Sequence, residues 1–80
     1  MKIPRDLSGQ DLIKYLKKYG YNITRQTGSH IRITTQLNGQ HHVTIPNHDP
    51  LKIGTLSAIL TDIAMHFDKT RDQLLLEFFG

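Results

Sequence analysis

The fold is decided by residues 21–45, which read YNITRQTGSHIRITTQLNGQHHVTI. Apolar and polar residues alternate along three segments of this stretch, residues 21–26, 30–37 and 40–45. Such alternation is typical of strands that bury one face. Thr27-Gly28-Ser29 and Asn38-Gly39 separate the segments, and Asn-Gly is the strongest short signal for a hairpin turn. The stretch therefore predicts a three-stranded antiparallel meander.

The alternation also assigns the side chains of these strands to two faces. The apolar set is expected to point inward: Tyr21, Ile23, Ile31, Ile33, Leu37, Val43 and Ile45. The polar set is expected to point outward: Asn22, Thr24, Gln26, His30, Arg32, Thr34, His42 and Thr44. Because an antiparallel sheet can leave one face in water, we expect the polar face to remain uncovered.

Helical periodicity appears on both sides of this stretch. Residues 8–19 place apolar side chains at helical spacing, and Ser8 with Asp11 three residues later resembles a capping box. Gly20 follows in the position of a C-cap glycine. A second helix is expected to begin near Thr55, where another apolar stripe starts.

A third helix is predicted over residues 68–79, with Asp68 as its N-cap. Five of its last six residues are apolar, in the run Leu74-Leu75-Leu76-Glu77-Phe78-Phe79. This run either completes the core or forms a docking surface for a second copy of the chain or for a partner protein. The order α-β-β-β-α(-α) predicts an α+β fold, with residues 1–80 as a single domain and helices over the inner sheet face.

Length and composition limit the classes of function. The 80 residues include no cysteine, which excludes disulfide staples, thiol catalysis and cysteine zinc sites. This absence fits a cytoplasmic protein, and no stretch approaches the roughly 20 apolar residues of a membrane span. The net charge of +3 is uneven, because residues 1–54 carry eight Lys and Arg against three Asp, whereas residues 55–80 carry two against four acidic residues. The first part is therefore expected to bind an anionic partner.

The segment Gly28-Ser29-His30 is the main candidate for chemistry. A histidine that begins a strand after a glycine turn is exposed and held by a short loop, and the turn backbone can approach a phosphate. Imidazole accepts or donates a proton near neutral pH, which RNA cleavage by the 2′-hydroxyl requires. The alternative is a hairpin turn followed by an ordinary solvent-facing histidine.

Six basic residues are candidates for contacts with RNA phosphates: Lys14, Lys17, Lys18, Arg25, Arg32 and Lys52. The alternative is that they form a solvated surface without a ligand. No aromatic platform is expected on the outer face of the sheet, which argues against a single-strand binder that works by stacking.

The histidines His41, His42 and His48 do not predict a metal site. Neighbouring residues on a strand point to opposite faces, so His41 and His42 are poorly placed to share an ion. The chain has neither a HExxH motif nor cysteines to complete a zinc site, and no metal or other cofactor is predicted. We expect His41 at the edge of the core and His42 on the solvent-facing side of the sheet.

Several of these segments together resemble the HicA toxin family, small RNA-cleaving toxins of bacterial toxin–antitoxin systems. The resemblance runs from about Leu7 to Ala64 and rests on four segments in the family's order: KKYGY at 17–21, RQTGSH at 25–30, IPNH at 45–48 and GTLSAIL at 54–60. It implies a fold similar to the double-stranded-RNA-binding domain, with its own order of elements. The terminal segment 68–80 lies outside the resemblance, so its role is not inherited.

The resemblance also implies an activity and a partner. The activity is metal-independent endonucleolytic cleavage of mRNA, with His30 as the essential histidine and Gly28 and Ser29 as its supporting turn. The partner is a HicB-type antitoxin that covers the active face of the toxin. General acid–base cleavage usually uses a pair of groups, and we expect His48 rather than His42 to be the second.

Three functions are therefore weighed from the residues. In the first, the domain binds RNA and cleaves it with His30, while Arg25, Arg32 or Lys52 stabilises the charge on the phosphate. In the second, it is a non-catalytic RNA-binding module of the double-stranded type. In the third, it is an interaction adaptor that associates with itself or a partner through its apolar C-terminal helix.

Overall fold

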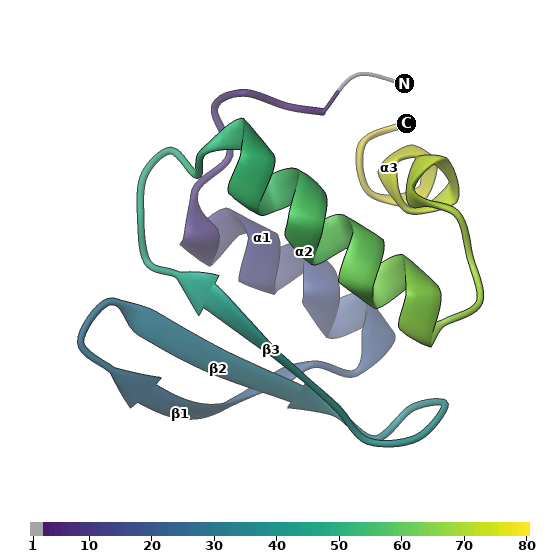
Figure 1. Ribbon diagram of the computed structural model, residues 1–80, viewed down its shortest axis with the longest axis horizontal. Helices are drawn as coiled ribbons and strands as arrows, with labels where there is room; N and C mark the ends of the chain where they lie inside the picture. Colours follow the sequence, from purple (N-terminus) through teal and green to yellow (C-terminus); the bar gives the residue numbers. More distant parts are fainter. Residues whose placement is uncertain (1–2) are drawn as a thin grey trace.

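The computed structural model describes residues 3–80 (Figure 1). Its elements are α1 (Gly9–Leu16), the 3-10 helix η1 (Lys17–Tyr19), β1 (Asn22–Thr27), β2 (His30–Thr35), β3 (His41–Pro46), α2 (Ile53–His66) and α3 (Arg71–Phe79). The strands form one antiparallel sheet in the order β1-β2-β3, and the helices lie together on one side of it (Figure 1). This arrangement confirms the predicted α+β fold and is consistent with a fold like that of the double-stranded-RNA-binding domain.

Both predicted hairpin turns are present. Thr27 pairs with His30, so Gly28 and Ser29 form a two-residue turn in which Gly28 has a φ of +58°. The second hairpin turns at Asn38 and Gly39, with φ values of +57° and +93°, but the last strand pair is Thr35 with His41, so its loop spans residues 36–40 rather than the two residues predicted. A short hairpin loop needs such positive φ angles to match the twist of its strands, and the sequence supplies residues that tolerate them.

The first helix begins and ends at the predicted residues. The Ser8 hydroxyl accepts a hydrogen bond from the backbone N–H of Asp11 at 3.0 Å, and the Asp11 carboxylate accepts one from the backbone N–H of Ser8 at 3.3 Å. These two bonds are the predicted capping box. The last turn tightens into η1, and Gly20 ends it with a φ of +81°.

The other two helices begin at residues different from those predicted. α2 begins at Ile53, two residues before Thr55, and α3 is capped by Thr70 rather than Asp68. Asp68 has a φ of +55° in the turn after α2, whereas Thr70 is extended and forms a capping box with Gln73. Within residues 3–80 no helix combines the length and apolar character needed to cross a membrane.

The apolar run at the C-terminus belongs to the core. Leu74, Leu75 and Phe78 of α3 are buried, whereas Leu76 is 64% exposed. The helix is also tied to η1 by polar contacts, because the Lys69 ammonium lies 2.7 Å from a carboxylate oxygen of Glu77 and both side chains bond to the Tyr19 hydroxyl. Of the two predicted roles, the run therefore serves the first: it completes the core.

Two of the residues predicted to point into the core are half exposed. Ile23 is 50% exposed because β1 is the edge strand, and all of its residues are exposed. Leu37 is 52% exposed because β2 ends at Thr35, so the alternation no longer applies to it. The position that closes this part of the core is Thr35, whose buried hydroxyl donates to the Tyr19 carbonyl at 2.7 Å.

A β-bulge in β1 reverses the predicted alternation. Ile23 pairs with Ile33 but Arg25 pairs with Arg32, so Thr24 is an extra residue in β1. After the bulge, Arg25 therefore lies on the open face of the sheet. Gln26, predicted on the open face, pairs with Ile31 and lies on the helix side instead.

Candidate functional site

The open face of the sheet holds a hollow of about 220 Å³, lined by Arg25, Thr27, His30, Arg32 and Thr44. All three strands contribute to it, because Arg32 pairs with Arg25 on one side and with Thr44 on the other. The β-bulge is what brings Arg25 into this group. The strands and their connections, residues 21–46, contain no Asp or Glu, so the charge of the hollow is purely cationic.

The two arginines form a cross-strand pair of like charges. Guanidinium groups stay protonated at all ordinary pH values, and like charges directly opposite each other weaken a sheet. A bound anion removes this repulsion. Phosphate fits particularly well, because arginine can donate two parallel N–H bonds to its oxygens.

The turn that carries His30 is attached to the rest of the fold at its backbone. The Ser29 carbonyl accepts a hydrogen bond from the Asn47 backbone N–H at 2.6 Å. The Asn47 side-chain oxygen in turn accepts one from the Gln10 amide at 3.1 Å. The turn is thus connected through the loop after β3 to the first turn of α1. The start of α1 and the end of β3 are in close contact: a Cβ atom on Gly9 would lie only 2.1 Å from the Pro46 carbonyl oxygen.

The imidazole of His30 is available to a ligand. The side chain is exposed at the start of β2 and lines the cationic hollow. Among residues 3–80, no side-chain or backbone group is hydrogen-bonded to its ring. An imidazole in this position can take a proton from a bound hydroxyl or give one to a leaving oxygen.

His48 lies at the same end of the sheet as His30. His30 pairs with Pro46, and His48 follows two residues later in the loop. Its carbonyl accepts a hydrogen bond from the Gly9 N–H at 2.9 Å, and its side chain is exposed. No bond joins the two imidazoles, both of which belong to the described part of the chain.

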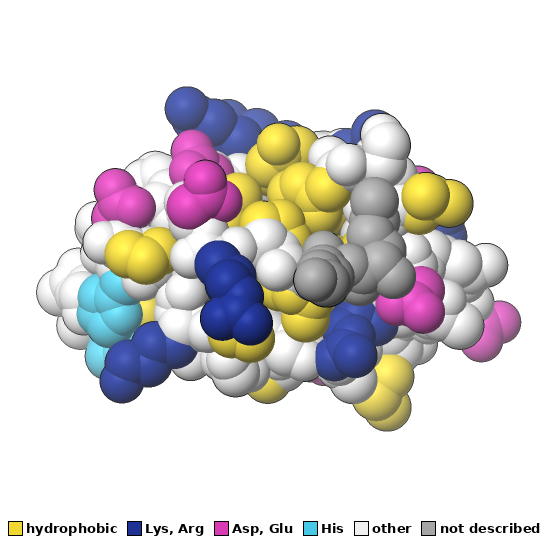
Figure 2. Space-filling view, turned by 90° about the horizontal axis from the view of Figure 1, so that it is seen from above, with side chains coloured by type: hydrophobic (Ala, Val, Ile, Leu, Met, Phe, Trp, Pro, Cys, Tyr) yellow, Lys and Arg dark blue, Asp and Glu magenta, His cyan; other side chains and the backbone are white. Residues whose placement is uncertain are grey.

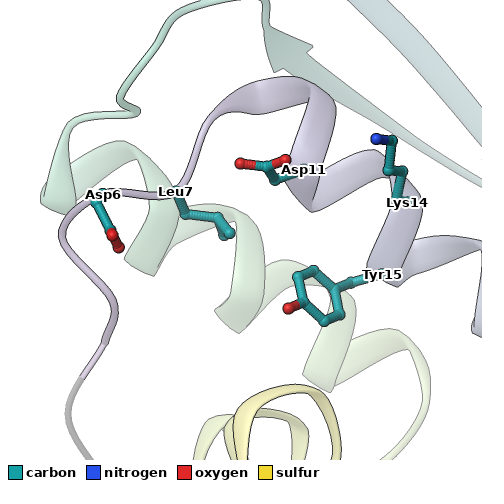
Figure 3. A pocket seen from close by; sticks show the side chains of 5 residues that line it. All are labelled: Asp6, Leu7, Asp11, Lys14 and Tyr15. Atoms are coloured by element: carbon teal, nitrogen blue, oxygen red, sulfur yellow. The ribbon is translucent and has the colours of Figure 1, made fainter.

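The predicted lysines lie outside the hollow, in the helical layer. Lys17 and Lys18 are in η1, and Lys52 is the residue before α2. Lys14 lines a different hollow of about 510 Å³, together with Asp6, Leu7, Asp11 and Tyr15 (Figure 3). That hollow carries two carboxylates, so it is less suited to a phosphate than the cationic one. The predicted basic set is therefore divided between two layers of the molecule.

His41 lies at the edge of the core, as predicted. Its Nε2 is 3.2 Å from a carboxylate oxygen of Asp62 and its Nδ1 is 2.6 Å from the Tyr21 hydroxyl. In a neutral imidazole Nε2 carries the proton, because the carboxylate only accepts, and Nδ1 then accepts from the Tyr21 hydroxyl. Burial, and to a smaller extent the charge of Asp62, raises the pKa of Tyr21 well above its usual range. No sequence pattern pointed to His66, whose ring stacks on that of His41 at a centroid distance of 4.4 Å.

A row of hydrogen bonds crosses the open face beside the cationic hollow. The Thr24 and Thr34 hydroxyl oxygens are 2.8 Å apart, and the Thr34 oxygen is 2.8 Å from Nδ1 of His42. These contacts bury Thr34 although it lies on the predicted outer face. Within residues 3–80, no three His, Asp or Glu side chains converge as metal ligands would.

The sequence was compared with models of protein families, with curated proteins and with solved structures. A family model described as HicA toxin of bacterial toxin–antitoxin matches residues 9–65. The match spans well over half of the chain and includes the whole sheet with the cationic hollow, while α3 lies beyond it. Neither the curated proteins nor the solved structures gave a match to this chain.

Proposed function

This chain belongs to the HicA toxin family of bacterial toxin–antitoxin systems, and we propose that it is a toxin that cleaves mRNA with His30 as a general acid or base. The observation that carries the proposal is the unbonded ring of His30 beside Arg25 and Arg32 in a carboxylate-free sheet. Family membership also implies an antitoxin that neutralises the toxin. We propose that this partner is of the HicB type and covers the open sheet face.

The proposed reaction is attack of the RNA 2′-hydroxyl on the adjacent phosphorus. The scissile phosphate lies between the guanidinium groups of Arg25 and Arg32, which stabilise the negative charge that builds up on its oxygens. His30 takes the proton of the 2′-hydroxyl as the new P–O bond forms. The P–O5′ bond breaks, and the leaving oxygen takes a proton from a second group. The products are a 2′,3′-cyclic phosphate and a free 5′-hydroxyl, and no metal takes part.

Two histidines are candidates for the second proton-transfer group. His48 is favoured because its loop follows Pro46, the pairing partner of His30. His42 is the alternative, and its Nδ1 is already bonded to Thr34, which leaves Nε2 toward solvent. Replacing each of these histidines by asparagine in turn identifies the second group. Only the loss of the group that transfers the proton removes one limb of the pH–rate profile.

The decisive experiment compares wild-type protein with His30→Ala on a short mRNA in the presence of a chelator. We expect His30→Ala to lower the rate of cleavage by about 10²- to 10⁴-fold, the usual contribution of a general acid or base. Growth inhibition in cells should disappear with it. Because His30 is exposed and its ring is unbonded, the thermal unfolding midpoint should stay close to that of the wild type.

A matched control is available in His66→Ala, which removes a histidine of the helical layer. His66 donates to the backbone carbonyls of Leu37 and Gly39 at 3.0 Å, so this variant should lose stability but keep its specific cleavage rate while folded. If folded His30→Ala cleaves RNA at the wild-type rate, the catalytic assignment is wrong. Intact RNA with salt-dependent binding by the wild type would instead favour the non-catalytic RNA-binding module.

A further inference from the structure

A second hollow lies on the open face of the sheet, next to the cationic one. It measures about 380 Å³ and is lined by Gly20, Asn22, Thr24, Thr34, Gln36 and Leu37. The two hollows adjoin along β2, because Arg32 and Thr34 are two residues apart on one face, a distance of about 7 Å. The row of hydrogen bonds from Thr24 through Thr34 to His42 marks the boundary between them.

The floor of this hollow is held in place by backbone contacts. A Cβ atom on Gly20 would lie 2.9 Å from a methyl carbon of Leu37, so the leucine side chain packs directly on the glycine. The Thr35 hydroxyl donates to the Tyr19 carbonyl at 2.7 Å and accepts from the backbone N–H of Leu37 at 3.1 Å. These bonds fix the leucine outside the core, where half of its surface faces solvent.

The polar groups of the hollow are neutral, and they are amides and hydroxyls. Asn22 donates from its amide nitrogen to the Gly20 carbonyl at 3.3 Å, which leaves its side-chain oxygen as an acceptor. The Gln36 side chain is exposed, and within residues 3–80 its amide has no hydrogen-bond partner. The hollow thus combines an apolar surface with unused donors and acceptors and carries no charge.

We propose that this hollow binds a nucleobase next to the scissile phosphate and thereby gives the enzyme a base preference. This inference rests on the proposed function, since the phosphate is taken to occupy the hollow of His30. The base lies with one face on Leu37, and its edge meets the amides of Gln36 and Asn22. RNA is read in this way where single-stranded bases are splayed out and bonded along their edges.

The chemistry of the hollow favours one base. An Asn or Gln amide has one donor and one acceptor side by side, which matches the N6 and N7 atoms of adenine. A phosphate is a poor occupant, because no Lys or Arg lines this hollow, whereas two arginines line the neighbouring one. The cationic hollow therefore holds the phosphate of the nucleotide, and the neighbouring uncharged hollow holds its base.

The test uses a set of short single-stranded RNAs that differ only in the bases flanking the cleaved bond. Wild-type protein should cleave the RNA with adenine at one flanking position about tenfold faster than the RNA with uracil there. Gln36→Ala and Leu37→Ala should each reduce that ratio towards one. Matched controls are Gln26→Ala, an amide on the opposite face of β1, and Ile23→Ala, an aliphatic side chain of equal exposure. Both controls should keep the ratio.

A binding measurement with His30→Ala and the same RNAs separates this inference from the proposed function. Binding that depends on the flanking base and on Gln36, without cleavage by wild-type protein, supports the nucleobase site and overturns the nuclease. Cleavage and binding that are both indifferent to the flanking base overturn the nucleobase site and leave the nuclease standing. If Gln36→Ala weakens only antitoxin binding, the hollow is a protein contact and the inference is wrong.

Discussion

The open sheet face and the helical layer differ in how their charges are used. Every acidic residue of the chain lies outside residues 21–46, and in the helical layer acids and bases meet each other, as Lys69 and Glu77 do. Figure 2 looks onto that layer from the side away from the sheet and shows basic, acidic and hydrophobic side chains interspersed. The sheet instead sets Arg25 opposite Arg32, and among the described residues neither arginine forms an ion pair with a carboxylate.

The difference indicates which layer serves the fold and which serves a ligand. Charged groups that form ion pairs or cap helices within the molecule lower the free energy of the folded state. They are also less available to bind a ligand. Positive charges that face each other in solvent lower the stability of the fold through their repulsion, and a bound anion removes that repulsion. The helical layer is therefore expected to respond to mutation mainly in stability, and the sheet face mainly in binding.

The largest expected effect tests the helical layer. Truncation after Phe67 removes three buried side chains of α3, worth roughly 5–9 kcal/mol at about 1.5–3 kcal/mol each. A domain of this size has only about 4–12 kcal/mol of stability, so the truncated chain should be unfolded by circular dichroism. A truncated chain that folds and cleaves RNA would show that the core does not need α3. If that chain also loses self-association or partner binding, the result would support the adaptor role.

A milder change measures the same contribution in a chain that still folds. Leu74→Ala should lower the free energy of unfolding by about 2–5 kcal/mol, because the leucine is completely buried. Leu76→Ala is the matched control on the same helix, and at 64% exposure it should change stability by about 0.5 kcal/mol or less. Urea titration distinguishes the two, and equal losses would contradict the packing described here.

The next effect tests the sheet face through the salt dependence of RNA binding. Arg25→Gln should lower the slope of log K against log salt by about 0.7–0.9, the share of one neutralised phosphate. Lys14→Gln should change it less, because Lys14 lies beside Asp11 in the helical layer. If both variants reduce the slope equally, the helical layer also contacts RNA and the division between the layers is wrong.

The smallest effect concerns the buried contact between the sheet and α2. Tyr21→Phe removes the hydroxyl that donates to His41, which should cost about 1–2 kcal/mol near neutral pH. The raised pKa of Tyr21 means that the unfolded chain loses this proton first as pH rises. Stability should therefore fall above the usual tyrosine pKa of about 10, and less steeply in Tyr21→Phe. Tyr15→Phe, at a partly exposed tyrosine, should keep the wild-type slope in thermal unfolding scans.

The parts of the fold that local chemistry controls could be predicted from the sequence. Alternation located the strands, Asn38-Gly39 located a turn, and Ser8 with Asp11 located a helix start. The true start of α3 also had a local signal, since Thr70 and Gln73 have capping-box spacing. Asp68 was the wrong choice because the turn after α2 forces it into a left-handed conformation.

The arrangement of the candidate site depends on contacts between distant residues, so less of it could be predicted. The bulge at Thr24 follows from how β1 pairs with β2, and no local sequence pattern predicts it. Without it, alternation would have put Arg25 on the helix side, away from Arg32. Likewise, the exposure of Leu37 depends on Gly20 and Thr35, which meet it only in the folded chain.

The close contact of Gly9 with the Pro46 carbonyl has a consequence for how the toxin can be inactivated. Asn47 follows Pro46 in the chain, and its backbone N–H donates to the carbonyl of Ser29. Ser29 is the residue directly before His30. A methyl group on residue 9 would push the loop outward and shift the turn with it. The first helix thus helps to position the turn that carries His30. If the proposed function is right, a substitution at Gly9 should therefore reduce cleavage although Gly9 lies in the helical layer.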